Sequence, residues 1–266
     1  MLKISEFASS FGLVLAGFLL AAKHAAPDLL HLTYLGAAFL MLGSSAFLLN
    51  DYFDYEHDKH KGRRLRQKME RGKIFFLAAG LFLAGALISS LLPQKTFYLL
   101  VLTYAATFVY SAQPFRFKEK FLLDFTFHGI VGPLLILTGY SAVSEINLPI
   151  IALSVPQFFM FANSAILQQM RDIKADKKAG FNTTAIKFAN PVRIAQAFIV
   201  LAAASLVAAV LLFYPPYFML FVAALLPYFP ALFREGDYYR RNYDATKQSA
   251  LIFIAVSAAV FYLYFM

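Results

Sequence analysis

Long apolar stretches recur along the chain and constrain its fold more than any other feature. Runs of roughly 18 to 22 mainly apolar residues follow one another, about the length that a helix needs to cross a bilayer. Charged residues make up only 15% of the sequence, against about 25% in a soluble domain. We therefore predict an all-α membrane protein of about nine transmembrane helices, with spans near 4–22, 29–49, 74–93, 96–113, 121–142, 148–167, 192–213, 216–233 and 247–266.

The basic residues fall almost entirely on one side of these predicted spans. With the N-terminus placed in the cytoplasm, only Lys23 and Lys95 of the 24 Lys and Arg residues lie in outer loops. This asymmetry predicts the orientation by the positive-inside rule. The net charge of +9 is then explained by topology and by contact with lipid headgroups, so nucleic acid is not an expected partner. We predict a multi-pass protein of a prokaryotic cell membrane, with no obligatory protein partner indicated.

The connections differ in character between the two sides. The predicted outer loops are short, whereas the inner loops are long and rich in Asp, Arg, Lys and Tyr. Functional residues are commonly carried on loops that a rigid scaffold positions, which places the expected site on the inner side. Residues 1–266 are predicted to form one polytopic domain of two four-helix halves and a ninth helix, each half bearing an Asp-rich motif.

The first Asp-rich motif follows the second predicted span. If the segment is helical, Asp51, Asp54 and Asp58 share one face, where like charges at this spacing destabilise the helix. A cation would offset that repulsion. Magnesium takes hard oxygen ligands and binds through a few carboxylates plus substrate phosphates. The motif therefore predicts a magnesium site.

A second Asp-rich motif follows the sixth predicted span. Asp172 and Asp176 are four residues apart, on one helix face, and Arg171 and Lys174 lie among them. Two facing acidic helices joined by metal ions would hold a diphosphate, and the basic neighbours would neutralise its remaining charge. The alternative is that either motif is a solvated segment that caps a helix, since Asp near a helix start is favourable.

The two motifs resemble those of the UbiA superfamily of intramembrane prenyltransferases. The first signature of that family, Asn-Asp-x-x-Asp-x-x-x-Asp, matches Asn50, Asp51, Asp54 and Asp58, and the second, Asp-x-x-x-Asp, matches Asp172 and Asp176. The segment from Tyr110 to Lys118 is similar to the family's basic segment after the fourth helix. The stretch from Arg63 to Gly72 differs from the Arg-Pro-x-Arg-Pro of many members but keeps the charges of Arg64 and Arg66.

The resemblance implies a ring of helices around a central cavity that opens to lipid. It also implies a cytoplasmic cap formed by the 2-3 and 6-7 loops, and two magnesium ions that hold an isoprenyl diphosphate while its allylic carbon–oxygen bond ionises. The metal ligands carried over are Asp51, Asp54, Asp58, Asp172 and Asp176. The prenyl group would pass to an aromatic or lipid-like acceptor.

Other residues on the inner side are candidates for binding the substrate. Positive charge must face the departing diphosphate, and Arg116 and Lys118 are the predicted catalytic helpers, with Arg171 next. Polar residues inside spans are costly and usually functional. The candidates of this second kind are Tyr110, Asp124, Asn163 and Gln168. Asn50 in the first motif and Arg64 and Arg66 in the loop after it are also predicted to bind substrate. Asp124 could instead pair with Lys118 or Lys120, and His128 could be either a base or a core histidine.

Two other functions use the same residues. A UbiA-type terpene cyclase would ionise the same diphosphate but close the cation on its own chain. A divalent-cation transporter would use the carboxylates as ligands, although such sites generally lie near the bilayer midplane and these motifs lie at one face. The loop at 59–73, with its many cations, could be a lid that closes over a bound diphosphate.

Overall fold

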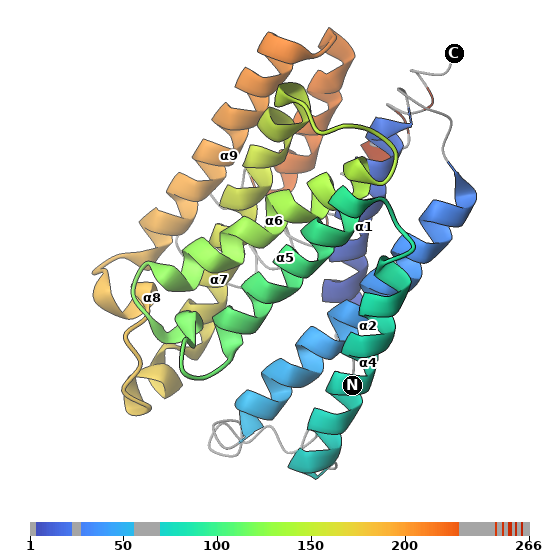
Figure 1. The fold of residues 1–266 in the computed structure, drawn as a ribbon. Helices are drawn as coiled ribbons and strands as arrows, with labels where there is room; N and C mark the ends of the chain where they lie inside the picture. The colour runs from blue at the N-terminus through green and yellow to red at the C-terminus, as the bar shows by residue number, and fades with distance from the viewer. Residues whose placement is uncertain are drawn as a thin grey trace.

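The helices of this protein pack into one elongated bundle, shown in Figure 1 for a computed structural model. The structure describes residues 4–22, 28–55 and 70–228, with isolated positions beyond 247. The longer helices of these ranges are α1 (Ile4–Ala21), α2 (Leu29–Phe53), α4 (Arg71–Ser89), α5 (Gln94–Ser111), α6 (Leu123–Ser141), α7 (Leu148–Lys178) and α9 (Pro191–Phe213). The shorter ones are η2 (Phe117–Glu119), α8 (Thr184–Lys187) and the 3₁₀ helix η3 (Pro216–Tyr228).

These positions confirm the predicted all-α fold, because each of the first eight predicted spans coincides with a helix. Five of the helices, α2, α4, α6, α7 and α9, are long and apolar enough to cross a membrane. Large apolar side chains on their outer faces are exposed, such as Phe76 at 75% and Leu211 at 74%, as expected where lipid replaces water. The ninth predicted span, 247–266, lies almost wholly outside the described residues, and so does most of the proposed lid at 59–73.

The sequence sets the helix ends through side-chain caps and turn residues. Asp28 accepts a hydrogen bond from the Leu30 amide at the start of α2, and Asn147 and Asn190 do the same for α7 and α9. Both asparagines are followed within two residues by a proline, which is favoured in a first turn because its missing N–H is not needed there. These capping residues therefore mark where the three helices begin.

The bundle is held together by close contacts between helices that are distant in sequence. Helix α1 packs on α6, α2 on α4, and α7 on both α6 and α9. Glycines allow a very close approach of α1 and α6, where a Cβ added at Gly139 would overlap the Val14 carbonyl and one at Gly17 would overlap the Ile136 carbonyl. Small residues allow such approaches between membrane helices. They bring the first predicted span against the fifth.

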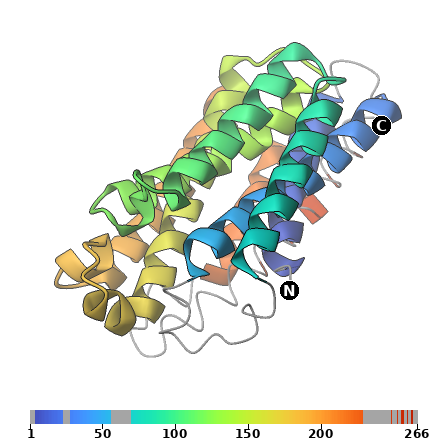
Figure 2. The same ribbon diagram turned by 60° about the horizontal axis from the view of Figure 1, so that its bottom comes forward.

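Several helix ends that carry polar motifs meet at one end of the bundle, the lower end in Figure 1. They are the C-terminal ends of α2, α5 and α7 and the start of α6. Figure 2 turns this end toward the viewer and shows the segment after α5 beside the end of α7 and α8, across from the end of α2. Both α2 and α7 continue past the predicted limits of their spans, to Phe53 and Lys178. The second acidic motif therefore lies in the last turns of α7, and the described part of the first lies at the end of α2 and directly after it.

Candidate functional site

A cavity of about 280 Å³ opens between α1, α2, α5, α6 and α7. Its apolar wall includes Phe39, Leu42, Leu100, Val131 and Leu135. Along α2 the lining runs from Phe39 to Asp51, a distance of about 18 Å at the helical rise per residue. The cavity is thus an elongated apolar space that reaches the first acidic motif at one end.

The polar lining of this cavity comes from neutral side chains as well as Asp51. Asn50, Tyr110 and Gln168, all predicted to contact substrate, lie in the lining, and so does His128. The His128 ring lies between those of Tyr110 and Phe161, with centroids 5.5 Å and 5.6 Å away. The other polar lining residues of the described chain were not predicted from the sequence: Ser10, Thr103, Tyr104, Thr107 and Ser111. Four of these form a polar stripe along α5, a signal that was present in the sequence.

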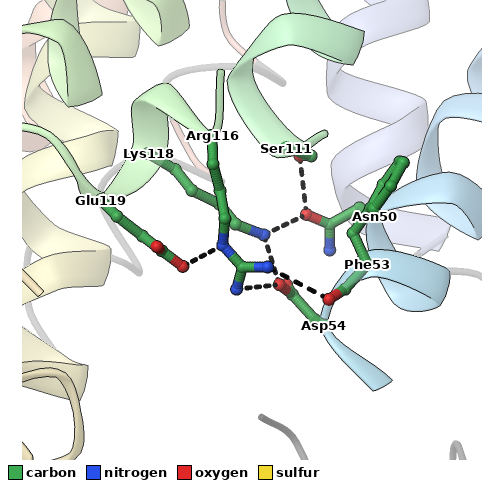
Figure 3. A network of polar contacts seen from close by, with 7 residues as sticks. All are labelled: Asn50, Phe53, Asp54, Ser111, Arg116, Lys118 and Glu119. Atoms are coloured by element: carbon green, nitrogen blue, oxygen red, sulfur yellow. Dashed lines mark hydrogen bonds and ion pairs between the residues drawn. The ribbon is translucent and has the colours of Figure 1, made fainter. Parts of the chain in front are cut away.

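The basic segment, which we define as residues 116–122, lies against the first motif (Figure 3). The Lys118 ammonium donates to Asp54 Oδ1 at 2.5 Å and to Asn50 Oδ1 at 3.1 Å. The Arg116 guanidinium also reaches Asp54 Oδ1, at 3.3 Å, and donates to the Phe53 carbonyl at 3.2 Å. Ser111 Oγ donates to Asn50 Oδ1 at 2.9 Å. The predicted helpers and the predicted metal ligand Asp54 are therefore side by side.

The charged side chains of this cluster are largely buried, so the electrostatic interactions among them are strong. The side chains of Arg116, Lys118 and Asp54 are only 12%, 15% and 17% exposed. Burial lowers the pKa of Lys118, and the adjacent Asp54 carboxylate opposes that effect. Burial raises the pKa of Glu119, while its ion pair with Arg116 acts in the opposite direction. Glu119 binds the Arg116 Nε and so fixes the direction in which the guanidinium points.

The second motif lies in the last turns of α7. Asp176 is buried, at 6% exposed. Asp172 instead forms a bidentate ion pair with Arg171, whose Nε and Nη2 donate to its two carboxylate oxygens at 3.0 Å and 3.2 Å. Arg171 therefore neutralises Asp172 in this structure, and Lys174 is exposed. Helix α7 ends in a Schellman turn, with the Phe181 amide on the Asp176 carbonyl and Gly180 at a φ of 75°, a conformation that favours glycine.

Four predicted substrate contacts of the described chain do not line the cavity: Arg171 and Lys174 at the end of α7, and Asp124 and Asn163. Asp124 is fully buried and accepts hydrogen bonds from Thr184 and from the Phe125 amide, not from Lys118 or Lys120. Lys118 binds Asp54 instead, and the Lys120 ammonium lies 5.4 Å from the centre of the Phe117 ring. Asn163 is also fully buried, and its amide has no hydrogen-bond partner within the described chain. Asp58, Arg64 and Arg66 lie outside the described residues.

The donor set fits magnesium if the substrate supplies some of the ligands. Among the residues with described positions, no three His, Asp or Glu side chains come close enough to hold a metal on their own. Magnesium usually keeps several waters and uses one or two carboxylates plus phosphate oxygens. The carboxylates of Asp51 on α2, of Asp54 directly after it, and of Asp172 and Asp176 on α7 match that requirement in their chemistry.

The fold and site define an integral, multi-pass membrane protein with a charged site at one end of an apolar cavity. The model of the UbiA prenyltransferase family matches residues 10–259, and the chain belongs to this family. It is 31% identical over 179 residues to a lycopene elongase/hydratase of Haloferax volcanii. It is also 31% identical over 172 residues to a 4-hydroxybenzoate octaprenyltransferase of Burkholderia pseudomallei.

These curated relatives are matched over part of their length. Each alignment covers 62% of this chain, and 56% and 58% of the two relatives. Solved structures match over the whole chain. A UbiA homolog from Archaeoglobus fulgidus bound to GPP and Mg²⁺ superposes with a TM-score of 0.79, 18% identity and 98% coverage of both chains. The apo structure of a homolog from Aeropyrum pernix K1 gives 0.76 and 17%, again with 98% of both chains. At these identities the likeness establishes the fold.

Proposed function

We propose that this protein is a magnesium-dependent intramembrane prenyltransferase that transfers a prenyl group to an aromatic or lipid-like acceptor. The observation that carries the proposal is the apolar cavity that ends at Asn50 and Asp51, beside the buried Lys118. A prenyl diphosphate has an apolar tail and a highly charged head. This site offers each part a matching environment.

In the proposed complex, the diphosphate lies between the end of α2 and the end of α7. Magnesium, when bound, would act as a Lewis acid that stabilises the charge developing on the departing diphosphate. Asp51, Asp54, Asp172 and Asp176 would hold it. Lys118 and Arg116 now both contact Asp54, and a diphosphate beside them would offer a stronger anionic partner.

The prenyl tail would lie along α2 in the cavity. Tyr110 precedes Ser111, which bonds to Asn50, and the His128 ring lies 5.5 Å from the Tyr110 ring. Both rings are therefore near the first motif, where the allylic carbon would be. Aromatic faces attract a cation, an effect worth about 0.5–2 kcal/mol for each ring. The names of the relatives, one acting on lycopene and one on 4-hydroxybenzoate, support an apolar or aromatic acceptor.

The proposed function is tested with the purified protein and isotope-labelled prenyl diphosphates. We expect release of inorganic diphosphate that requires magnesium and stops with a chelator, together with labelled product among lipids that copurify with the protein, measured by mass spectrometry. Labelled cyclic product formed without any acceptor would identify a cyclase. Absence of diphosphate release with every chain length would overturn the proposal.

We also propose that the site faces the cytoplasm. Since the chain contains no cysteine, single cysteines can report the topology. Ala179, at the site end, and Gln94, at the opposite end, are both exposed. An impermeant thiol reagent should label Ala179→Cys only from the cytoplasmic side and Gln94→Cys only from the other side. Labelling of both variants from the same side would contradict this topology.

A further inference from the structure

We propose that Asp124 is a positioning residue that fixes the basic segment to the second aspartate motif, so that the two can act on one diphosphate. The proposal rests on the proposed function for its catalytic consequence, and on the geometry alone for its structural part. It assigns to Asp124 a role other than contact with substrate. The residue lies at the start of α6, between two segments that are far apart in sequence.

The first observation is the number of hydrogen bonds that the buried Asp124 carboxylate receives. Oδ2 accepts from the Thr184 amide at 2.5 Å, and Oδ1 accepts from Thr184 Oγ1 at 2.6 Å and the Phe125 amide at 2.7 Å. A buried charge is costly unless it is compensated in this way. Asp124 also binds the first amide of α8, for which Thr183 makes no side-chain cap. A carboxylate from another helix therefore caps α8.

The second observation is that the same place joins two backbone segments. We define the post-motif turn as residues 179–185, which follow the second motif directly. The Asn182 amide donates to the Glu119 carbonyl at 3.0 Å, and Lys120 and Asn182 form an isolated parallel bridge. The Leu122 amide donates to Thr184 Oγ1 at 3.0 Å. The basic segment and the post-motif turn are thus joined by hydrogen bonds at two points just before Asp124 in the chain.

The third observation is that each of the two joined segments contains or contacts a predicted catalytic residue. Phe181, in the post-motif turn, bonds through its amide to the carbonyl of Asp176, and its ring lies 5.8 Å from the Arg116 guanidinium. Gln169, on α7, accepts from the Ala185 amide at 2.9 Å. A shift of the post-motif turn would therefore change the position of Asp176 relative to Arg116 and Lys118.

Two residues of the basic segment adopt backbone conformations that need external support. Arg116 has a φ of 42° and Leu122 a φ of 64°, which are unfavourable for residues with a side chain. The Leu122 amide is held by Thr184 Oγ1, which Asp124 in turn holds. The Asp124 and Thr184 pair thus stabilises the conformation that presents Lys118 to Asp54.

The test uses variants of both partners. Asp124→Asn and Thr184→Val each remove part of the pair, whereas Thr184→Ser keeps the hydroxyl. We expect kcat to fall about 10- to 100-fold in the first two variants, as for residues whose hydrogen bonds hold a ligating side chain in position. We expect kcat to stay near wild type in Thr184→Ser. The Asp124→Asn and Thr184→Val effects should be less than additive. Asp28→Asn, at the opposite end of the bundle, is the matched control.

A second readout is independent of turnover. Spin labels are placed on cysteines that replace two exposed residues, Phe115, directly before the basic segment, and Lys178, at the end of α7. They report the separation between that segment and the end of α7. We expect a narrow distance distribution that broadens in Asp124→Asn and Thr184→Val. A control pair at Leu87 and Leu211, both exposed and distant from this site, should keep its width in every variant.

The outcomes separate this inference from the proposed function. An unchanged distance distribution in both variants would overturn the inference, and so would wild-type kcat in both. Full activity in Thr184→Val beside an inactive Asp124→Asn would assign Asp124 to substrate contact instead. If the wild-type protein turned over no prenyl diphosphate, the proposed function would fail, but the distance distributions would still decide the structural part. If Asp124→Asn does not fold, Thr184→Val carries the test.

Discussion

We expect alanine at any one of Asp51, Asp54, Asp172 or Asp176 to abolish nearly all magnesium-dependent turnover. Each variant would remove a carboxylate from the proposed metal site and cost several kcal/mol of transition-state stabilisation. That corresponds to a loss of roughly a thousandfold or more in kcat. Diphosphate release at saturating substrate measures the effect. Asp58, one turn further along the motif, should matter less.

The control for this series is Asp28→Ala, which removes a helix cap at the opposite end of the bundle. It should lower stability by about 1 kcal/mol and leave kcat unchanged for the folded protein. If the alanine variants of the two motifs kept near-normal turnover, neither motif would hold the metal. The acidic clusters would then have a structural role at the helix ends, such as the capping role that the sequence left open.

The second large effect is expected at Lys118. Replacing Lys118 by Met removes a buried charge that now binds Asp54 and Asn50 and that we propose moves to the diphosphate. Loss of one preorganised donor to a developing anion costs about a hundred- to a thousandfold in kcat. Lys118→Arg keeps the charge and should recover part of the activity, since its donors have a different shape.

Two comparisons make the Lys118 result interpretable. Lys95→Met removes a lysine that pairs with Glu145 in a loop outside the site, and it should leave kcat unchanged. A Lys118→Met protein that kept its kcat, with only its amount in the membrane reduced, would make Lys118 a topology-setting charge. The kinetic constants must therefore be normalised to folded protein.

The helices and the two motifs could be predicted from sequence because their signals are local. Apolar runs of membrane length and carboxylates at helical spacing need no knowledge of distant partners. Two helices continue past the predicted span limits at 49 and 167, since a helix can extend beyond the apolar run that would cross a membrane. Helices α2 and α7 continue to Phe53 and Lys178, and the basic residues in the last turn of α7 are favourable there.

The contacts within the site could not be predicted, because they join residues that are far apart in sequence. Lys118 and Asp54 are 64 positions apart, and Asp124 and Thr184 are 60 apart. The sequence offered Lys118 or Lys120 as partners for Asp124 because they are close in the chain. A hydroxyl and an amide of the post-motif turn satisfy it instead. Local charge pairing is a weak guide where a fold can supply buried neutral donors.

The central claim is that one prenyl diphosphate is bound jointly by the two acidic motifs, through magnesium, and by the basic segment. The most direct measurement is the affinity of the purified protein for a non-hydrolysable prenyl diphosphate analogue, titrated calorimetrically with and without magnesium. We predict tight binding only when magnesium is present, and loss of that dependence in both Asp54→Asn and Asp172→Asn. Equal affinity with and without magnesium in the wild-type protein, or an unchanged magnesium dependence in both variants, would contradict the account.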